Sequence, residues 1–180
     1  KSHAIYVDET GVKLQKKGNK KLHQAYMWVL CGSPPGITAP LVWLNFKENR
    51  KHENAQVLIE DFSGVVHSDV YGAYETMAAL GTFTWAPCWV HARRKFINAT
   101  EGAIRTQAIK LIDELQRNER QVWEMTDHER LIFRKDVQAP VVDEFIQYIT
   151  DKQSSMQVML SKSLGEACNY FLKRKNHFKN

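Results

Sequence analysis

The sequence has few cysteines, and their placement excludes several kinds of site. Cys31, Cys88 and Cys168 are an odd number, and no two of them have a CxxC spacing. A disulfide framework or a four-ligand zinc site needs paired ligands, so we expect neither. Cys88 and His91 have a spacing that zinc can use, but the chain offers no second pair. We therefore predict a protein of the reducing cytoplasm.

Long apolar runs are also missing. No stretch approaches the roughly 20 apolar residues of a membrane span, and no signal peptide is visible. We therefore expect no membrane partner. The chain begins with Lys1 rather than Met and enters a strand-like segment almost at once, so we interpret it as a piece of a longer protein.

The composition is that of a globular protein with a slight basic excess. The chain has 180 residues, of which 43% are hydrophobic and 25% are charged. This length suits one domain, or one domain with a helical annex, and is enough to bury a core. A formal charge of +5 and a pI of about 9.1 favour a polyanionic partner only weakly.

The chain begins with a predicted buried strand that is followed by two carboxylates. Ala4–Val7 is an apolar run that stops at Asp8 and Glu9, which predicts a strand buried on both faces. We expect Gly11 to turn the chain into a short alternating segment, Val12–Gln15. Four lysines between residues 16 and 21 then suit a hairpin tip, either as a solvated loop or in contact with phosphate.

The rest of the first half predicts an antiparallel meander followed by a crossover. Two further strands are expected at Gln24–Leu30 and Leu41–Phe46, separated by the break Ser33–Gly36. A helix of about three turns from His52, with apolar residues at helical spacing as far as Phe62, then leads to a short strand at Val65–His67. A strand placed after a helix in this way is expected to pair in parallel with the first strand.

The remaining segments are predicted to be one more strand and then helices. Val70–Leu80 is expected to be a helix that stops at Gly81, and Thr82–Ala86 a fifth strand. Beyond Pro87 the pattern is helical. The predicted helices contain the following residues: Cys88–Ala99; Ile104, Ala108, Leu111, Ile112 and Leu115; Val142, Phe145, Ile146 and Ile149; and, in the last and longest, Met156, Met159, Leu160, Leu164, Ala167, Cys168, Phe171 and Leu172.

Two aspartates in this predicted sheet suggest metal chemistry. Asp8 follows the first strand and Asp69 follows the fourth, and parallel neighbours would place both at one edge of the sheet. Carboxylates that lie close together repel, which raises one pKa or recruits a cation. Magnesium suits such a pair because it prefers hard oxygen ligands, and a pair of ions can assist phosphodiester cleavage. The alternative is two turn-capping aspartates without a metal.

A basic segment follows the fifth strand. Cys88–Phe96 includes His91, Arg93, Arg94 and Lys95, with Trp89 and Phe96 beside them. Cations and aromatics near the start of a helix suit phosphate contact and base stacking, so we expect a DNA-binding element. A solvated basic helix face is the alternative.

These segments together resemble one transposase family. Val7–Thr10, Ser68–Tyr74 and Cys88–Phe96 are similar to the insertion-sequence-sixty-six type of DDE transposase, and Arg50, Gly165–Ala167 and Asn169–Tyr170 also fit. The resemblance implies a ribonuclease H-like core at residues 1–100, a helical insertion or annex at 101–180, and a mixed five-stranded α/β sheet. It also implies that the full-length protein is a bacterial, cytoplasmic enzyme that transposes DNA with Mg²⁺ or Mn²⁺. Its DNA partners would be transposon ends and a target, and we expect it to self-associate.

The resemblance implies that Asp8 and Asp69 are the first two acids of the catalytic triad, and that His91, Arg93 and Arg94 belong to the family's basic helix. The family's third acid is a glutamate after an Asp-Asn-Asn segment, and no such segment occurs here, so we expect it beyond Asn180. Glu166 matches another family position. We also set Glu9 aside, because it should point to the opposite face from Asp8.

Three functions therefore remain open for the chain. The first is a transposase whose fragment is inactive alone, because the third metal ligand is missing. The second is another ribonuclease H-like metal nuclease, such as a resolvase. The third is a non-catalytic DNA-binding or assembly module formed by the helices after Pro87.

Overall fold

A computed structural model describes residues 2–18, 20–33, 39–156 and 160–180. The chain divides into two compact units, which we call the sheet unit, Lys1–Cys88 with Asn180, and the helical unit, Trp89–Lys179. The packing boundary thus lies before the basic helix, whereas the predicted domains, 1–100 and 101–180, place theirs after it. The division into functional domains stays a prediction.

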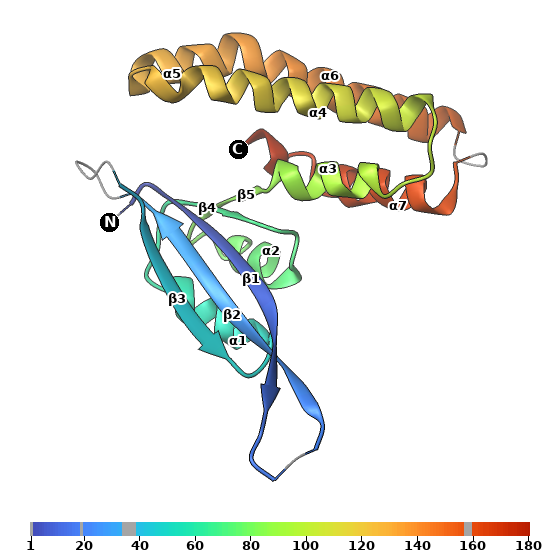
Figure 1. The fold of residues 1–180 in the computed structure, drawn as a ribbon. Helices are drawn as coiled ribbons and strands as arrows, with labels where there is room; N and C mark the ends of the chain where they lie inside the picture. Colours follow the sequence, from blue (N-terminus) through green and yellow to red (C-terminus); the bar gives the residue numbers. More distant parts are fainter. Residues whose placement is uncertain (1, 19, 34–38, 157–159) are drawn as a thin grey trace. The chain divides into compact units, whose positions relative to one another are not determined.

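The sheet unit is built on a mixed sheet of five strands (Figure 1). Its spatial order is β3-β2-β1-β4-β5, with β1–β2 and β2–β3 antiparallel and β1–β4 and β4–β5 parallel. This order confirms the predicted meander, the crossover and the parallel fourth strand. The strands are β1 Ala4–Gln15, β2 Leu22–Gly32, β3 Leu41–Lys47, β4 Val65–Ser68 and β5 Thr84–Pro87.

β1 is longer than its sequence indicated. It continues through Asp8, Glu9 and Gly11 to Gln15, so the predictions that the strand stops at the carboxylates and that Gly11 turns the chain are wrong. The reason is pairing: residues 5–15 of β1 form one unbroken antiparallel ladder with β2, whereas β4 pairs only with residues 4–6. The two carboxylates therefore lie within β1, just beyond the point where its parallel partner ends.

Two helices cover one face of the sheet. α1 is His52–Ile59 and α2 is Gly72–Ala78, and Gly81, with φ of +77°, follows α2 as the predicted stop. α1 ends at Ile59 and is shorter than the three turns expected. The core between helices and sheet contains the following buried residues: Val7, Trp28, Ala55, Ile59, Val66, Ala73, Tyr74, Met77, Phe83 and Trp85.

The opposite face of the sheet carries exposed apolar side chains. Tyr6, Val42 and Leu44 are 58%, 59% and 59% exposed, and Tyr6 stacks on His67 with ring centroids 4.7 Å apart. Residue alternation along a strand explains the contrast, because Tyr6 and Asp8 flank the buried Val7 and point away from it. Asp8 belongs to this exposed face.

The helical unit has its own core. A cluster of aromatic rings, including Phe96, Phe145 and Phe171, lies at its centre, and each of these three is fully buried. After Pro87 the described residues contain no strand, as predicted. The helical elements are α3 Trp89–Ile97, α4 Ala103–Gln121, η1 Val122–Glu124, α5 Asp127–Phe133, the π-helical turn η2 Arg134–Gln138, α6 Ala139–Met156, α7 Lys162–Leu172 and η3 His177–Lys179.

Two predictions about these helices are wrong. The last helix does not extend back to Met156, because Met156 ends α6 and the side chain of Ser161 caps a new helix by accepting from the Leu164 amide at 3.3 Å. It is also not the longest, since α4 has 19 residues and α7 has 11. Met159 and most of the predicted break at Ser33–Gly36 lie outside the described residues.

None of the helices in the described ranges is long and apolar enough to cross a membrane. All three cysteines are free.

Candidate active site

Adjacent carboxylates of β1 point to opposite sides of the sheet. Asp8 is exposed, and its Oδ1 accepts the backbone N–H of Glu9 at 2.9 Å. Glu9 lies on the helix-covered face, where its side chain is only 1% exposed. The alternation that we expected between these two residues is therefore confirmed.

Arg50 connects Glu9 with Asp69. Its Nε donates to Glu9 Oε1, and its Nη2 donates to Asp69 Oδ2 at 2.8 Å. Asp69 directly follows β4, and its other carboxylate oxygen accepts the backbone N–H of Tyr71 at 2.9 Å, which leads the chain into α2. One guanidinium thus holds a carboxylate within β1 and another just after β4, in the charge-assisted geometry that suits arginine.

Two tyrosines support this arrangement. The Arg50 guanidinium lies over the Tyr71 ring, 4.3 Å from its centroid, and the Tyr71 hydroxyl donates to the Arg50 carbonyl oxygen at 2.5 Å. The Tyr74 hydroxyl donates to Glu9 Oε2 at 3.4 Å. Arg50 is therefore fixed by its backbone as well as by its side chain. We call Glu9, Arg50, Asp69, Tyr71 and Tyr74 the Arg50 cluster.

The electrostatics of the Arg50 cluster follow from its partial burial. Burial raises the pKa of Glu9, and the neighbouring Asp69 carboxylate adds to this, while Arg50 opposes it. Burial also raises the pKa of Tyr74, next to Glu9. With two formal negative charges facing one positive charge, the Arg50 cluster keeps a net negative charge.

A row of polar side chains crosses the sheet beside Glu9. Glu9 pairs with Trp28 on β2, and Trp28 with Asn45 on β3, so the three residues share the covered face. The Trp28 indole N–H and the Asn45 amide oxygen are buried and have no hydrogen-bond partner in the part of the chain that the structure describes. The Arg50 cluster therefore borders polar groups that a water or ligand atom would satisfy.

The described residues do not by themselves form a metal site. Carboxylate oxygens are the right kind of ligand for Mg²⁺, but no group of three or more His, Cys, Asp or Glu side chains is placed to hold a metal among them. Both Asp69 oxygens already accept hydrogen bonds, and Asp8 lies on the other face from Glu9. The pairing of Asp8 with Asp69 around a cation stays a prediction.

The four predicted DNA-binding residues of α3 have different surroundings. Arg93 forms a two-point ion pair with Asp113 of α4, with Nε–Oδ1 and Nη2–Oδ2 distances of 2.5 and 3.2 Å. Lys95 lies over the Tyr170 ring, 5.2 Å from its centroid, and Arg94 is exposed. His91 is partly buried, and its Nδ1 has no hydrogen-bond partner among the described residues. Arg94 and Lys95 are therefore the residues best placed to meet a partner, and the DNA-binding role stays a prediction.

The aromatic residues of the same helix are part of the core. Trp89 packs against the rings of Phe145, Phe171 and Phe178, with centroids 5.0–5.5 Å apart, and Phe96 is fully buried. The expectation that these aromatics suit base stacking is therefore wrong. Rings from α6, α7 and η3 enclose them, and sequence spacing within α3 could not reveal these distant partners.

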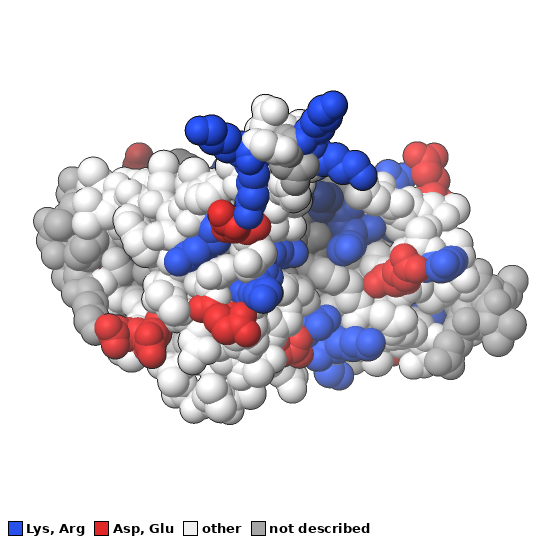
Figure 2. Space-filling model, turned by 90° about the horizontal axis from the view of Figure 1, so that it is seen from below, with Lys and Arg blue, Asp and Glu red and all other residues white. Residues whose placement is uncertain are grey.

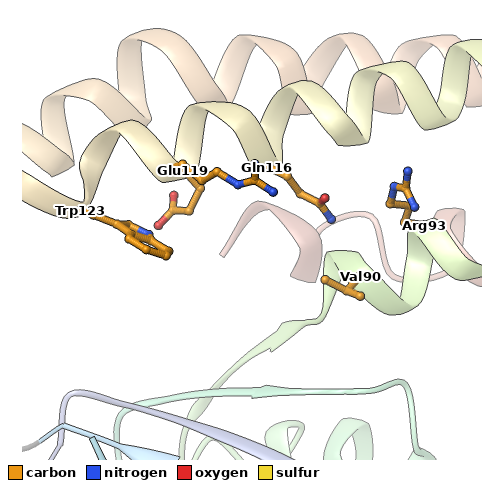
Figure 3. Close-up of a pocket in the computed structure, with 6 residues that line it drawn as sticks. Val90, Arg93, Gln116, Glu119 and Trp123 are labelled. Carbon is orange, nitrogen blue, oxygen red and sulfur yellow. The ribbon is translucent and has the colours of Figure 1, made fainter. Parts of the chain in front are cut away.

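Arg93 also lines a shallow hollow of about 350 Å³ between α3 and α4. Figure 3 shows Arg93 and Val90 on α3 and Gln116, Glu119 and Trp123 along the other side. Trp123 is 76% exposed. Because Arg93 and Glu119 are engaged by Asp113 and Arg134, the hollow offers few polar groups for a small ligand.

Comparison with known proteins decides the family. The sequence matches the model of the family described as "Transposase IS66 family" over residues 1–180. The chain belongs to the IS66 transposase family. It is 28% identical to the "Uncharacterized protein y4hP" of Sinorhizobium fredii, in an alignment covering 94% of this chain and 34% of that protein. Two more proteins of the same organism, y4jD and y4qI, are 25% and 26% identical over 93% and 95% of the chain and 35% and 34% of their own lengths.

This IS66-family chain thus spans about a third of the length of the curated relatives that it matches. Its sequence motifs contain four residues whose part in the Arg50 cluster we did not predict: Glu9, Arg50, Tyr71 and Tyr74. Glu9 adjoins Asp8, Tyr74 ends the segment Ser68–Tyr74, and Arg50 was noted without a role. The presence of these residues in the motifs was the only sequence signal of their role, and the fold is needed to show that they are in contact.

Proposed function

We propose that this chain is the catalytic-core portion of a DNA transposase, and that the longer protein cleaves and joins DNA strands. Membership of the IS66 transposase family over the whole chain is the observation that carries the proposal. In such chemistry water attacks a phosphodiester and frees a 3′-hydroxyl. That hydroxyl then attacks a target phosphodiester and releases a new 3′-hydroxyl. The DNA partners would be transposon ends and a target, met by a self-associated protein in the bacterial cytoplasm.

The sheet supports a ribonuclease H-like assignment. Its mixed order, with β1 and β4 parallel, brings the end of β4 beside the middle of β1, where Asp69 and Asp8 occur. We propose Asp8 and Asp69 as ligands of Mg²⁺ or Mn²⁺ in the longer protein. When bound, such an ion would stabilise charge on the reacting phosphate. We expect this chain alone to be inactive, because the family's third acidic ligand does not occur in it.

The residues of this chain have a clearer task, which is to position Asp69. Arg50 fixes one carboxylate oxygen, the Tyr71 amide fixes the other, and Glu9 keeps Arg50 in place. A preorganised carboxylate loses little entropy when a partner arrives. We propose that Asp69 is held in this way for its role in DNA strand transfer.

The test compares Asp8→Asn and Asp69→Asn with Glu166→Gln, which removes an exposed acid of α7. In the longer protein we expect each Asn variant to lose strand cleavage and joining by at least about a hundredfold, while the Gln variant keeps it. Mn²⁺ binding, followed by electron paramagnetic resonance, should weaken in the same two variants. Circular dichroism controls for folding.

One observation favours the alternative of a non-catalytic DNA-binding or assembly module. Arg50 already engages both Glu9 and Asp69, as expected of a purely structural ion pair. That alternative predicts that both Asn variants bind DNA and metal as the unchanged protein does. Wild-type strand transfer by folded Asp8→Asn and Asp69→Asn proteins would reject the proposed active site.

A further inference from the structure

The β1–β2 hairpin extends beyond the rest of the sheet. β2 pairs with β3 only from Tyr26 to Gly32, while the ladder with β1 continues outward to the pair Gln15–Leu22 (Figure 1). Among the described residues, the outer part is therefore a two-stranded ribbon without a third strand beside it. Its turn contains Gly18 with φ of +80°, a conformation that glycine adopts without strain.

Lysines cover the outer part of this ribbon. They are Lys13 on β1 and Lys16, Lys17, Lys20 and Lys21 around the turn, and all five are exposed. Figure 2 views the molecule from the side toward which the hairpin points, and lysine or arginine side chains spread outward around the projecting lobe in several directions. We call these five residues the hairpin lysines.

The segment that forms the outer part of the hairpin and β3 is itself free of acidic residues. Residues 10–47 contain six lysines and no aspartate or glutamate. The remainder of the chain therefore holds 19 of the 25 basic residues and all 20 acidic ones, which makes it close to neutral. The whole formal excess of +5 thus resides in the segment that forms the hairpin and β3, and a polyanion would be attracted there.

The contacts of Lys16 and Lys13 leave most of their charge available. Lys16 pairs with Glu48 at 2.6 Å, but both side chains are about half exposed, so the pair is weak and screened by salt. Lys13 donates to the Gln24 amide oxygen at 3.0 Å, a neutral partner that leaves the lysine charge uncompensated. The hairpin therefore presents exposed positive charge to solvent.

We propose that the β1–β2 hairpin lies in the major groove of duplex DNA and that the hairpin lysines contact phosphates on both sides of the groove. A two-stranded ribbon, with strands about 5 Å apart, fits a major groove about 12 Å wide. Lysine is a strongly hydrated point charge that suits phosphate contact without base specificity. The choice of DNA over other polyanions rests on the proposed transposase function.

The test measures how duplex binding depends on salt. The 180-residue chain and its Lys17→Gln, Lys20→Gln, Lys21→Gln triple variant are titrated against a fluorescein-labelled mixed-sequence duplex of 30 base pairs between 50 and 300 mM NaCl. We expect the triple variant to bind at least about tenfold more weakly at 100 mM, and its slope of log K against log salt to be shallower by about 2 to 3.

The control triple removes the same charge elsewhere. Lys110→Gln, Lys135→Gln and Lys162→Gln change exposed residues of α4, η2 and α7. We expect this variant to keep the slope of the unchanged chain, and all three proteins to keep the same melting temperature because the changed side chains are exposed.

Three outcomes would overturn the inference. They are an unchanged slope in the hairpin variant, an equal loss in the control variant, and stronger competition by single-stranded RNA than by duplex DNA. None of these outcomes contradicts the proposed transposase function, because that function is tested separately by strand transfer in the Asp8 and Asp69 variants. Loss of strand transfer in those variants together with an unchanged hairpin slope would reject the hairpin contact alone.

Discussion

Arg50 connects the antiparallel and the parallel parts of the sheet through its two ion pairs. It connects Glu9, from the antiparallel part, with Asp69, from the end of the parallel strand β4. Like charges at short distance repel, and the Arg50 guanidinium offsets the repulsion between these two carboxylates. The Arg50 cluster therefore works as a unit, and changing any one of its charges affects the other two.

The residue-scale prediction concerns Arg50→Gln. Removing the guanidinium leaves the nearly buried Glu9 carboxylate without its cation, so we expect a loss of about 2 kcal/mol in the free energy of unfolding. Urea denaturation at pH 7 measures it. Arg50→Lys keeps the charge but not the two-point geometry, and should lose a smaller amount.

The double variant Glu9→Gln, Arg50→Gln checks the cause. If the loss comes from the unpaired carboxylate, the double variant should recover part of the stability lost by Arg50→Gln. A double variant no more stable than the single one would show that Arg50 acts through packing on Tyr71 instead.

A few polar side chains add to the apolar contacts between elements of the helical unit. Glu119 near the end of α4 accepts from Arg134 of η2, with Nε–Oε2 at 3.2 Å, and from Gln138 Nε2 at 2.7 Å. Partial burial would raise the pKa of Glu119, but these hydrogen bonds outweigh it and the pKa is lowered. Glu119 thus ties α4 to the π-helical turn that precedes α6.

We predict that the stabilisation provided by the contact of Glu119 with Arg134 and Gln138 depends on pH. Because the folded state lowers the pKa of Glu119 below 4.5, its contribution is fully present well above pH 4.5 and is lost as the pH falls through the lowered folded value. Glu119→Gln should therefore cost about 0.5–1 kcal/mol at pH 7 and close to nothing in strong acid. Urea unfolding at a series of pH values measures this.

Glu144→Gln is the matched control, since Glu144 is an exposed residue of α6 and the substitution removes the same charge. Its effect should be small at every pH. A Glu119→Gln loss that stays constant as the pH falls would show that the charge of Glu119 does not contribute.

The sheet unit and the helical unit each bury a separate set of apolar residues. Val66 and Trp85 belong to the core under the sheet, while Phe145 and Phe171 belong to the core among the helices. Local stability follows local packing, so damage to one core should be felt first in its own unit.

Because the two cores are separate, we predict that a substitution in one core destabilises its own unit most. Phe145→Ala should cost about 3–5 kcal/mol and speed amide hydrogen exchange in the helical unit more than in β1, β2 and β4. Val66→Ala should do the reverse. Mass spectrometry of exchanged peptides measures both, and equal acceleration in both units would indicate one cooperative structure rather than two.

Much of the architecture could be predicted because it depends on local pattern. Alternation, helical spacing and the stops at Gly81 and Pro87 identified the five strands and their order. The helix α5 escaped prediction although Thr126 and Glu129 form a capping box, a signal present in the sequence. The extent of β1 could not be predicted, because a strand ends where its partners end, and β2 supports it beyond the carboxylates.

Neighbours along the chain were enough to predict the five strands, the family motifs and the opposite orientations of Asp8 and Glu9, because these depend on local pattern. The tertiary structure alone decided that Arg50 joins Glu9 to Asp69 and that Trp89 packs inside the helical core. Such contacts bring together residues far apart in sequence, and their free energy comes from charge pairing and burial that exist only once the chain has folded.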